Sequence, residues 1–344
     1  MDLKQFFRRA VRILLPLALG CLLLWYLYKD HDFREMMVIV KKGVRFEIIL
    51  FSLIFGLVAN AVRGLRWSML IDSLGKRVSR KNAIYAIWGN YAINMAIPRG
   101  GEIWRCGIMA KYEKIPFTKL LGTLFVDRIM DLLVVTVLTL CMCVFNINFF
   151  KNFFSDNPPL VLATIYTLIS SVWTYIALAV LALLVWFVFA KLNHFTVVKM
   201  IIEMIRNIWE GIKSLWKIEY KVRFFIQTLL IWGGYFLYFY ITFFAFDFTK
   251  DLGVRIALIA FTMSSIGVAA PVQGGVGVWH LMVTLTLVAF GVNSSDAAAF
   301  AFVVFAIQNV WVVLTGLFGI AALPIINKGQ KSPKENKDNF EINQ

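Results

Sequence analysis

Charged side chains within otherwise apolar segments are the residues of this sequence best suited to chemistry. Glu102 and Arg105 stand three residues apart. Asp127 and Asp131 stand four apart, and Arg128 lies between them. Side chains at these spacings share one face of a helix, where opposite charges can pair. Because a charge inside a membrane segment is costly unless it is paired or hydrated, the pattern predicts a hydrated pocket of functional residues.

The arginines of this group favour phosphate as a ligand. The planar donors of a guanidinium group bind two phosphate oxygens at once. We expect a lipid phosphate to contact Arg99 and Arg105, and also Arg128, while its acyl chains stay in the bilayer.

A purely structural role for the same charges is the alternative. In that interpretation Arg105 holds Glu102, and Arg128 neutralises Asp127 or Asp131. Paired charges of this kind would stabilise helix packing without contacting a substrate.

Further polar residues extend the candidate site. Arg63 and Arg66 stand near the inner end of a span, so we expect them to reach cytoplasmic headgroups by snorkelling, with a central role as the alternative. His280 is either a headgroup contact that titrates with the pocket or a hydrogen-bonded packing residue. Three uncharged residues would line the same cavity or bridge helices: Gln273, Gln308 and Asn309.

The elements that must position these residues are transmembrane helices. Of the 344 residues, 60% are hydrophobic and 16% are charged, which excludes an ordinary soluble domain. Segments such as 160–189 are apolar on every face, which disfavours the alternating strands of a barrel. Full spans are predicted at about 11–28, 46–71, 118–146, 160–190, 223–246 and 297–323. The fold class predicted is therefore an all-α polytopic membrane protein with about six full spans.

Two further apolar segments are each broken by Pro and Gly. One break follows residue 97 and contains Gly100 and Gly101; the other follows residue 270 and contains Gly274 and Gly275. We expect two re-entrant helical hairpins whose glycine amides are free to bind an anion. Each hairpin lies between two spans, which predicts an inverted repeat over 46–146 and 223–323. Two unrelated helix kinks remain the alternative.

The basic residues indicate the orientation of the chain. The net charge is +15, and Lys and Arg cluster before residue 13, within 191–223 and after residue 327. The positive-inside rule then places both termini in the cytoplasm, although the basic loop 29–45 would lie outside. Residues 195–220 predict an amphipathic helix on the cytoplasmic leaflet. We expect one domain over 1–327, with a disordered cytoplasmic tail over 328–344.

Several kinds of ligand are not expected. The sequence has no zinc spacing, no Walker loop and no aromatic-basic nucleic-acid patch, so we expect no metal, no cofactor and no nucleic acid. The four cysteines form no disulfide framework, and they are interpreted as packing residues.

The combination of motifs resembles the membrane region of the lysylphosphatidylglycerol synthases, also called the multiple peptide resistance factor family. The resemblance covers about residues 10–325. The motifs that carry it are Arg63-Gly64-Leu65-Arg66-Trp67, Pro98-Arg99-Gly100-Gly101-Glu102 with Arg105, Asp127 to Leu132, and Pro271 to Gly277. Family members often carry an acidic residue at the position of His280 and an arginine near Gln308, so charge details of the second hairpin are not transferred.

The resemblance implies a flippase-like protein that moves a lipid between the leaflets of a bacterial cytoplasmic membrane. We expect the lipid to be a phospholipid or a polyprenyl-phosphate-linked precursor. Only about twenty residues follow residue 323, so no aminoacyl transferase domain is expected. The alternatives are a membrane enzyme that acts on a lipid headgroup and a scaffold for a lipid-modifying transferase. The partners expected are membrane lipid, and either a second copy of the chain or such a transferase.

Overall fold

The computed structural model describes residues 43–97, 99–147, 218–269 and 275–328, together with Arg206, Trp209 and Lys213. Regular structure in these ranges is helical, apart from one isolated bridge between Val44 and Phe246. The elements are α3 (Phe46–Asp72), α4 (Arg80–Ala96), α5 (Gly100–Glu113), α6 (Phe117–Phe145), α11 (Lys221–Tyr240), η1 (Ile241–Ala245), α12 (Gly253–Ala269), α13 (Val278–Ala289) and α14 (Ser294–Ile326). The spans predicted at 11–28 and 160–190, most of the surface helix at 195–220 and the tail after residue 328 lie outside the described residues.

Four of the described helical segments are long and apolar enough to cross a membrane. They are α3, α6, the continuous segment Lys221–Ala245 and α14. These segments confirm the spans predicted at 46–71, 118–146, 223–246 and 297–323. The chain is therefore an all-α, multi-pass membrane protein.

Contacts between helix termini define two ends of the bundle. At the first end, Asn82 and Asn327 exchange two side-chain hydrogen bonds of 3.1 and 2.8 Å, which join the start of α4 to the end of α14. At the second end, the Arg255 Nε donates to the Asn146 Oδ1 at 2.6 Å, which joins the start of α12 to the end of α6. The Arg45 backbone N–H also donates to the carbonyl oxygen of Ala245 in η1, at 2.9 Å, at this second end.

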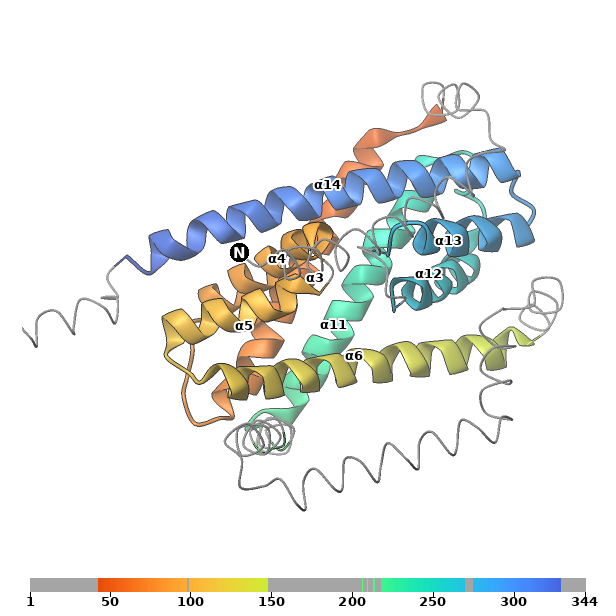
Figure 1. Ribbon diagram of the computed structural model, residues 1–344. Coiled ribbons are helices and arrows are strands. Elements are labelled where there is room, and N and C mark those ends of the chain that lie inside the picture. The colour runs from red at the N-terminus through yellow and green to blue at the C-terminus, as the bar shows by residue number, and fades with distance from the viewer. Residues whose placement is uncertain are drawn as a thin grey trace, which may run out of the picture.

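Each broken segment forms a helical hairpin that returns to the end where it began. Figure 1 shows α4 and α5 near one end of the bundle and α12 and α13 near the other, with α6 and α14 along the two sides and α11 crossing between the hairpins. The units α3 to α6 and α11 to α14 each consist of a span, a hairpin and a span, and their hairpins enter from opposite ends of the bundle. The two polar contacts at the bundle ends are equivalent in these two units, because each joins a hairpin to the last helix of the other unit.

The turn of the first hairpin depends on close backbone packing at Gly101. Its N–H donates to the Asn94 Oδ1 at 2.9 Å, and a Cβ on this residue would lie 2.0 Å from the carbonyl oxygen of Asn90. Arg99 precedes α5 in the left-handed conformation, with φ of 57°. In the second hairpin Gly277 has φ of 83°, a value that glycine adopts without strain. The glycines of both breaks thus have a geometric function.

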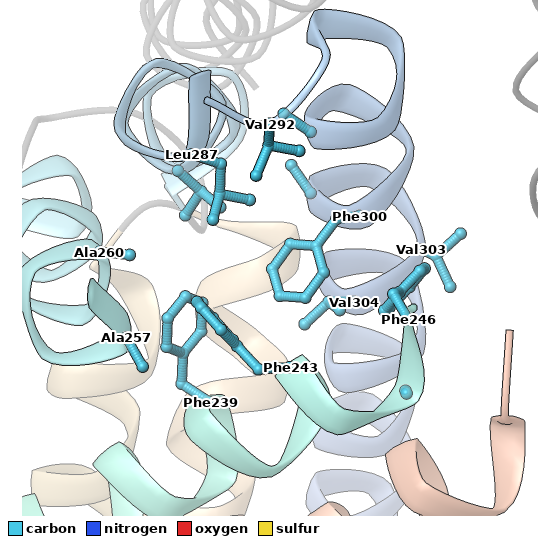
Figure 2. Packing of buried hydrophobic residues seen from close by; sticks show 14 of the residues in the cluster. Phe239, Phe243, Phe246, Ala257, Ala260, Leu287, Val292, Phe300, Val303 and Val304 are labelled. Atoms are coloured by element: carbon cyan, nitrogen blue, oxygen red, sulfur yellow. The ribbon is translucent and has the colours of Figure 1, made fainter. Parts of the chain in front are cut away.

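Aromatic residues fill the core at the second end. Phe239 of α11, Phe243 of η1 and Phe246, which follows η1, surround Phe300 of α14, and the small Ala257 of α12 leaves room for the rings (Figure 2). The ring centroids of Phe246 and Phe300 are 5.0 Å apart. This packing fixes the second hairpin against α11 and α14.

Helices α4 and α14 approach closely because small residues line their contact. A Cβ on Gly316 would lie 2.3 Å from the Cβ of Ala92 and 2.7 Å from the Trp88 carbonyl oxygen. A Cβ on Gly319 would likewise lie 2.8 Å from the carbonyl oxygen of Tyr85. Small residues are the usual means by which membrane helices pack backbone to backbone.

Replacing Gly316 tests this contact. We expect Gly316→Ala to lower the free energy of unfolding by about 1–3 kcal/mol through overpacking, measured by thermal unfolding in detergent. The matched control is Gly107→Ala, where an added Cβ meets nothing within 4 Å and the helix gains about 0.5–1 kcal/mol from the better helix former. Equal midpoints for the two variants would contradict the close packing of α4 and α14.

Candidate functional site

Asp127, on α6, is the centre of a buried ion-pair network. Its side chain is 0% exposed. Oδ1 accepts from the Arg66 Nη2 at 2.6 Å, while Oδ2 accepts from the Arg105 Nη2 at 3.1 Å and the Arg63 Nη2 at 3.5 Å. One carboxylate thus binds arginines from two other helices, α3 and α5. Ten residues into its helix, at about 1.5 Å per residue, it lies about 15 Å from the first end.

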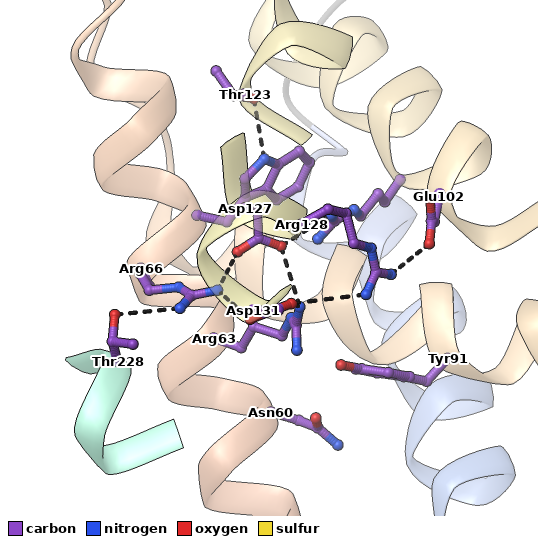
Figure 3. Close-up of polar contacts among 12 residues, drawn as sticks. Asn60, Arg63, Arg66, Tyr91, Glu102, Thr123, Asp127, Arg128, Asp131 and Thr228 are labelled. Atoms are coloured by element: carbon purple, nitrogen blue, oxygen red, sulfur yellow. Dashed lines mark hydrogen bonds and ion pairs between the residues drawn. The ribbon is translucent and has the colours of Figure 1, made fainter. Parts of the chain in front are cut away.

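Asp131 lies one helical turn further along α6 and shares two of the same arginines. Its Oδ1 accepts from the Arg66 Nη2 at 2.8 Å, and its Oδ2 accepts from the Arg63 Nη2. The i, i+4 spacing places both carboxylates on the face of α6 that meets α3. Figure 3 shows the two acids facing Arg66 and Arg63.

Neutral hydroxyl groups join the network to the second repeat. Thr228 of α11 accepts from the Arg66 Nη1 at 3.2 Å, and Tyr235, two turns further along α11, accepts from the Arg63 Nη1 at 3.5 Å. The Tyr235 hydroxyl also donates to the Asn60 Oδ1 at 2.7 Å. It lies 3.1 Å from the hydroxyl of Tyr91 on α4. Through these groups α11 contacts the charges held by α3 and α6.

An aromatic ring covers Arg105. The guanidinium carbon lies 4.5 Å from the ring centroid of Trp67, a distance at which a cation is attracted to the ring face. The Trp67 indole N–H donates to the Thr123 Oγ1 at 3.1 Å, which fixes the ring. Arg105 is 0% exposed, so it faces the network and not the lipid.

The accessible edge of the network is the ion pair between Arg128 and Glu102. The Arg128 Nη2 lies 2.5 Å from the Glu102 Oε1, and the Arg128 Nη1 lies 3.8 Å from the Asp131 Oδ2. The Arg128 side chain is 37% exposed and that of Glu102 is 20% exposed. Figure 3 shows the Arg128 guanidinium between Asp131 and Glu102. Side-chain exposure in the network therefore increases from the fully buried centre at Asp127 to the partly exposed edge between α5 and α6.

The charges of the network do not cancel. It holds four guanidinium groups, of Arg63, Arg66, Arg105 and Arg128, and three carboxylates, which leaves one positive charge in excess. Among the described residues, several buried guanidinium N–H groups have no acceptor: Nε of Arg66, Nε and Nη1 of Arg105, and Nε of Arg128. Unmet donors and excess positive charge in an apolar setting favour an anionic ligand.

The structure corrects two expectations about the arginines. Arg63 and Arg66 do not snorkel; they are 4% and 0% exposed and bind the carboxylates of α6. The i, i+3 pair of Glu102 and Arg105 does not form either, because Arg105 binds Asp127 and Glu102 binds Arg128, both on α6. The pairing expected between Arg128 and Asp131 is present at 3.8 Å.

The expectation of free glycine amides is wrong for the first hairpin. The Gly100 N–H donates to the Ile97 carbonyl oxygen at 3.0 Å, and the Gly101 N–H is bound by Asn94. Arg99 is exposed, and no ion pair joins it to the network in the described part of the chain. Gly100 and Gly101 thus shape the turn and do not bind an anion in this conformation.

Predicted residues of the second hairpin lie apart from the network or outside the described ranges. His280 is buried against Phe305, with ring centroids 4.3 Å apart, which favours the packing interpretation. Gly275 is buried, whereas Gln273 and Gly274 lie outside the described residues. Gln308 bridges helices, donating to the backbone oxygen of Tyr238 on α11 at 2.9 Å.

The sequence reasoning missed the neutral members of the site: Asn60, Tyr91, Thr228 and Tyr235. The seven-residue spacing of the last two on an apolar helix is the one available signal. Within the described ranges, His, Cys, Asp and Glu side chains form no group able to hold a metal ion.

The protein is therefore a multi-pass helical membrane protein with a buried arginine-carboxylate network. Residues 13–316 match the family model described as "Lysylphosphatidylglycerol synthase TM region". The chain belongs to this family, as the motifs around Arg63, Gly101, Asp127 and Gly275 led us to expect. No curated protein and no solved structure matches the chain.

Replacing Asp127 tests the role of the network in folding. Asp127→Asn leaves Arg66 and Arg105 buried with less compensating charge, so we expect the free energy of unfolding to fall by about 3–5 kcal/mol. The measurement is thermal unfolding in detergent. The double variant Asp127→Asn with Arg105→Gln returns the network to the parent's excess of one positive charge, and we expect it to recover part of the loss. A single variant as stable as the parent would show that the network does not stabilise the bundle.

Proposed function

We propose that this protein moves a phospholipid or a polyprenyl-phosphate-linked lipid between the leaflets of a bacterial cytoplasmic membrane. The observation that carries the proposal is the positively charged network inside the bundle, which becomes accessible at Arg128 between α5 and α6. A lipid phosphate could be attracted to this edge from the bilayer while its acyl chains stay in the membrane. Burying charged side chains in a membrane protein costs free energy, and a path for a lipid headgroup would explain why this cost is tolerated.

The inverted arrangement of the two hairpins supports an alternating-access mechanism. In transporters built this way, one repeat moves against the other around a central site. Here each hairpin is joined to the other repeat by a polar contact at its own end of the bundle, Asn82 with Asn327 and Asn146 with Arg255. Each contact consists of only one or two hydrogen bonds, which cost less to break than the buried ion pairs of the network, so such contacts are suited to opening and closing.

The charges at the two ends support a cytoplasmic location for the first end. Ten basic residues gather there in the described part of the chain, against the three acids Asp72, Glu113 and Glu219; the basic residues are Lys76, Arg77, Arg80, Lys81, Lys111, Lys114, Lys119, Lys221, Arg223 and Lys328. The second end carries a mixture of Arg45, Lys250 and Arg255 with Glu47, Asp247, Asp251 and Asp296. By the positive-inside rule the first hairpin then enters from the cytoplasm.

Reconstitution into liposomes with a fluorescent phospholipid tests lipid movement. We expect the parent protein to expose inner-leaflet label to a membrane-impermeant quencher, and Arg128→Gln to slow this movement at least tenfold through loss of a charge-assisted hydrogen bond. Arg80→Gln is the matched control, because Arg80 pairs with Asp72 near the first end and lies outside the network.

The same liposomes separate the competing functions. Recovered lipid of unchanged mass together with faster movement supports transport. A changed headgroup mass would indicate an enzyme, and a parent protein that neither moves nor converts lipid would contradict the proposal and favour a scaffold.

Cross-linking α6 to α12 tests the alternating-access part of the proposal. In a background without the native cysteines, we expect the pair Asn146→Cys and Arg255→Cys, joined by a reducible cross-linker, to lose lipid movement and to regain it on reduction. The single-cysteine variants treated in the same way are the controls. Undiminished movement in the cross-linked protein would show that these helices do not separate during transport.

A further inference from the structure

A groove at the start of α11 lies apart from the arginine network. Its described lining comes from residues 219–230, and its volume is about 730 Å³. Ligand sites commonly have volumes of about 300–1,000 Å³. The groove belongs to the first end of the bundle, because Ile218 and Phe224 pack in one apolar cluster with Ile115 and Leu120.

The polar part of this groove is suited to an anion. Tyr220 is the N-cap residue of α11, but its side chain accepts no hydrogen bond from the helix. The first backbone N–H groups of a helix have no partner within it, and the positive end of the helix attracts anions. Lys221 and Arg223 line the groove at the same place and add two positive charges, against one negative charge at Glu219.

The apolar part of the groove is a stripe along α11. Val222, Ile226 and Leu230 recur every four residues and therefore share one face of the helix. Their side chains are 73%, 48% and 55% exposed. The stripe leads from the basic start of α11 into the candidate span Lys221–Ala245. A ligand with an anionic head and a hydrocarbon chain matches this order of charge and apolar surface.

An unpartnered acceptor distinguishes the groove from an ordinary lipid-facing surface. Gln227 lines the groove and is 6% exposed, and its Oε1 has no hydrogen-bond partner in the described part of the chain. A buried carbonyl oxygen without a donor costs free energy. A ligand with an N–H or O–H group beside its anionic group would supply that donor.

We propose that this groove binds one phospholipid whose headgroup carries an N–H or O–H donor. The phosphate lies at the start of α11, the headgroup donates to Gln227, and an acyl chain lies along the apolar stripe. This site goes beyond the proposed function, because none of its residues belongs to the arginine network. Phe224 and Thr228, on the adjoining face of α11, contact Arg66 of that network, so a bound lipid would stabilise the helix that reaches it.

Two lipids of equal net charge test the proposal. Phosphatidylethanolamine carries N–H donors on its headgroup, whereas phosphatidylcholine carries none. Each lipid is titrated into purified protein in neutral detergent, and bound lipid is counted by native mass spectrometry. We expect phosphatidylethanolamine to bind about tenfold more tightly, because it satisfies the buried acceptor. Gln227→Met should remove this preference by weakening phosphatidylethanolamine alone, and Lys221→Gln with Arg223→Gln should weaken both lipids.

Matched variants outside the groove are the controls. Gln308→Met makes the same change at a glutamine that bonds to α11 at Tyr238. Arg77→Gln with Lys81→Gln removes two exposed charges elsewhere at the first end. Both variants should keep the preference for phosphatidylethanolamine, and thermal unfolding without added lipid checks that every variant is folded. Glycerophosphoethanolamine, which lacks acyl chains, should bind at least tenfold more weakly; equal binding would overturn the assignment of a lipid.

The outcomes separate this site from the proposed function. Equal affinities for the two lipids in the parent, or a preference retained by Gln227→Met, would overturn the site. Loss of the preference in Arg128→Gln would assign the binding to the network and would also overturn it. A preference that depends on Gln227 in a protein that moves no lipid would support the site and contradict transport. Lipid movement by a protein with equal affinities would do the reverse.

Discussion

The burial of Asp127 among three arginines is the interaction on which the rest of the structure depends. A carboxylate 0% exposed in an apolar bundle must be compensated, and its partners come from α3 and α5. Once those helices meet α6 at this point, the hairpin of α4 and α5 has a fixed depth. The Trp67 ring over Arg105 and the Thr123 hydroxyl complete the enclosure. Charge compensation thus determines how the first repeat packs.

The second repeat contacts this centre in a different way. Helix α11 offers hydroxyl groups, Thr228 and Tyr235, to arginines whose charge is already matched by aspartates. A hydrogen bond between a charged guanidinium and a neutral hydroxyl contributes about 1.5–3 kcal/mol, whereas breaking a buried ion pair costs about 3–5 kcal/mol. At the site the repeats are therefore connected by interactions weaker than the ion pairs that hold the charges within the first repeat.

Hydropathy and helix-breaking residues were sufficient to predict most of the architecture. The spans near α3, α6, α11 and α14 follow from apolar length, and both hairpins follow from Pro and Gly in the middle of apolar segments. The three acids of the network and its arginines Arg105 and Arg128 are recognisable as candidates from the sequence, whereas Arg63 and Arg66 are not. Their pairing was not predictable, because Glu102 could meet Arg105 on its own helix as readily as Arg128 on the next.

The depth at which a side chain lies within the bundle could not be predicted from the sequence either. Arg63 lies nine residues before the end of α3, about 14 Å at about 1.5 Å per residue, which permits either an interfacial or a buried position. The position of α6 decides between them, because Asp131 supplies the partner. Likewise Tyr235 appears in the sequence as one aromatic residue among many, and only the neighbouring Arg63 and Asn60 give it a polar role.

The glycine contact between α4 and α14 has a consequence for where acyl chains can pass. At Gly316 and Gly319 the two backbones lie too close for even a methyl group between them, so hydrocarbon cannot enter the bundle along that seam. A lipid tail that accompanies its headgroup must use another lateral opening. Under the proposed function, the α5–α6 side, where the Arg128 side chain is 37% exposed, is the candidate for that opening.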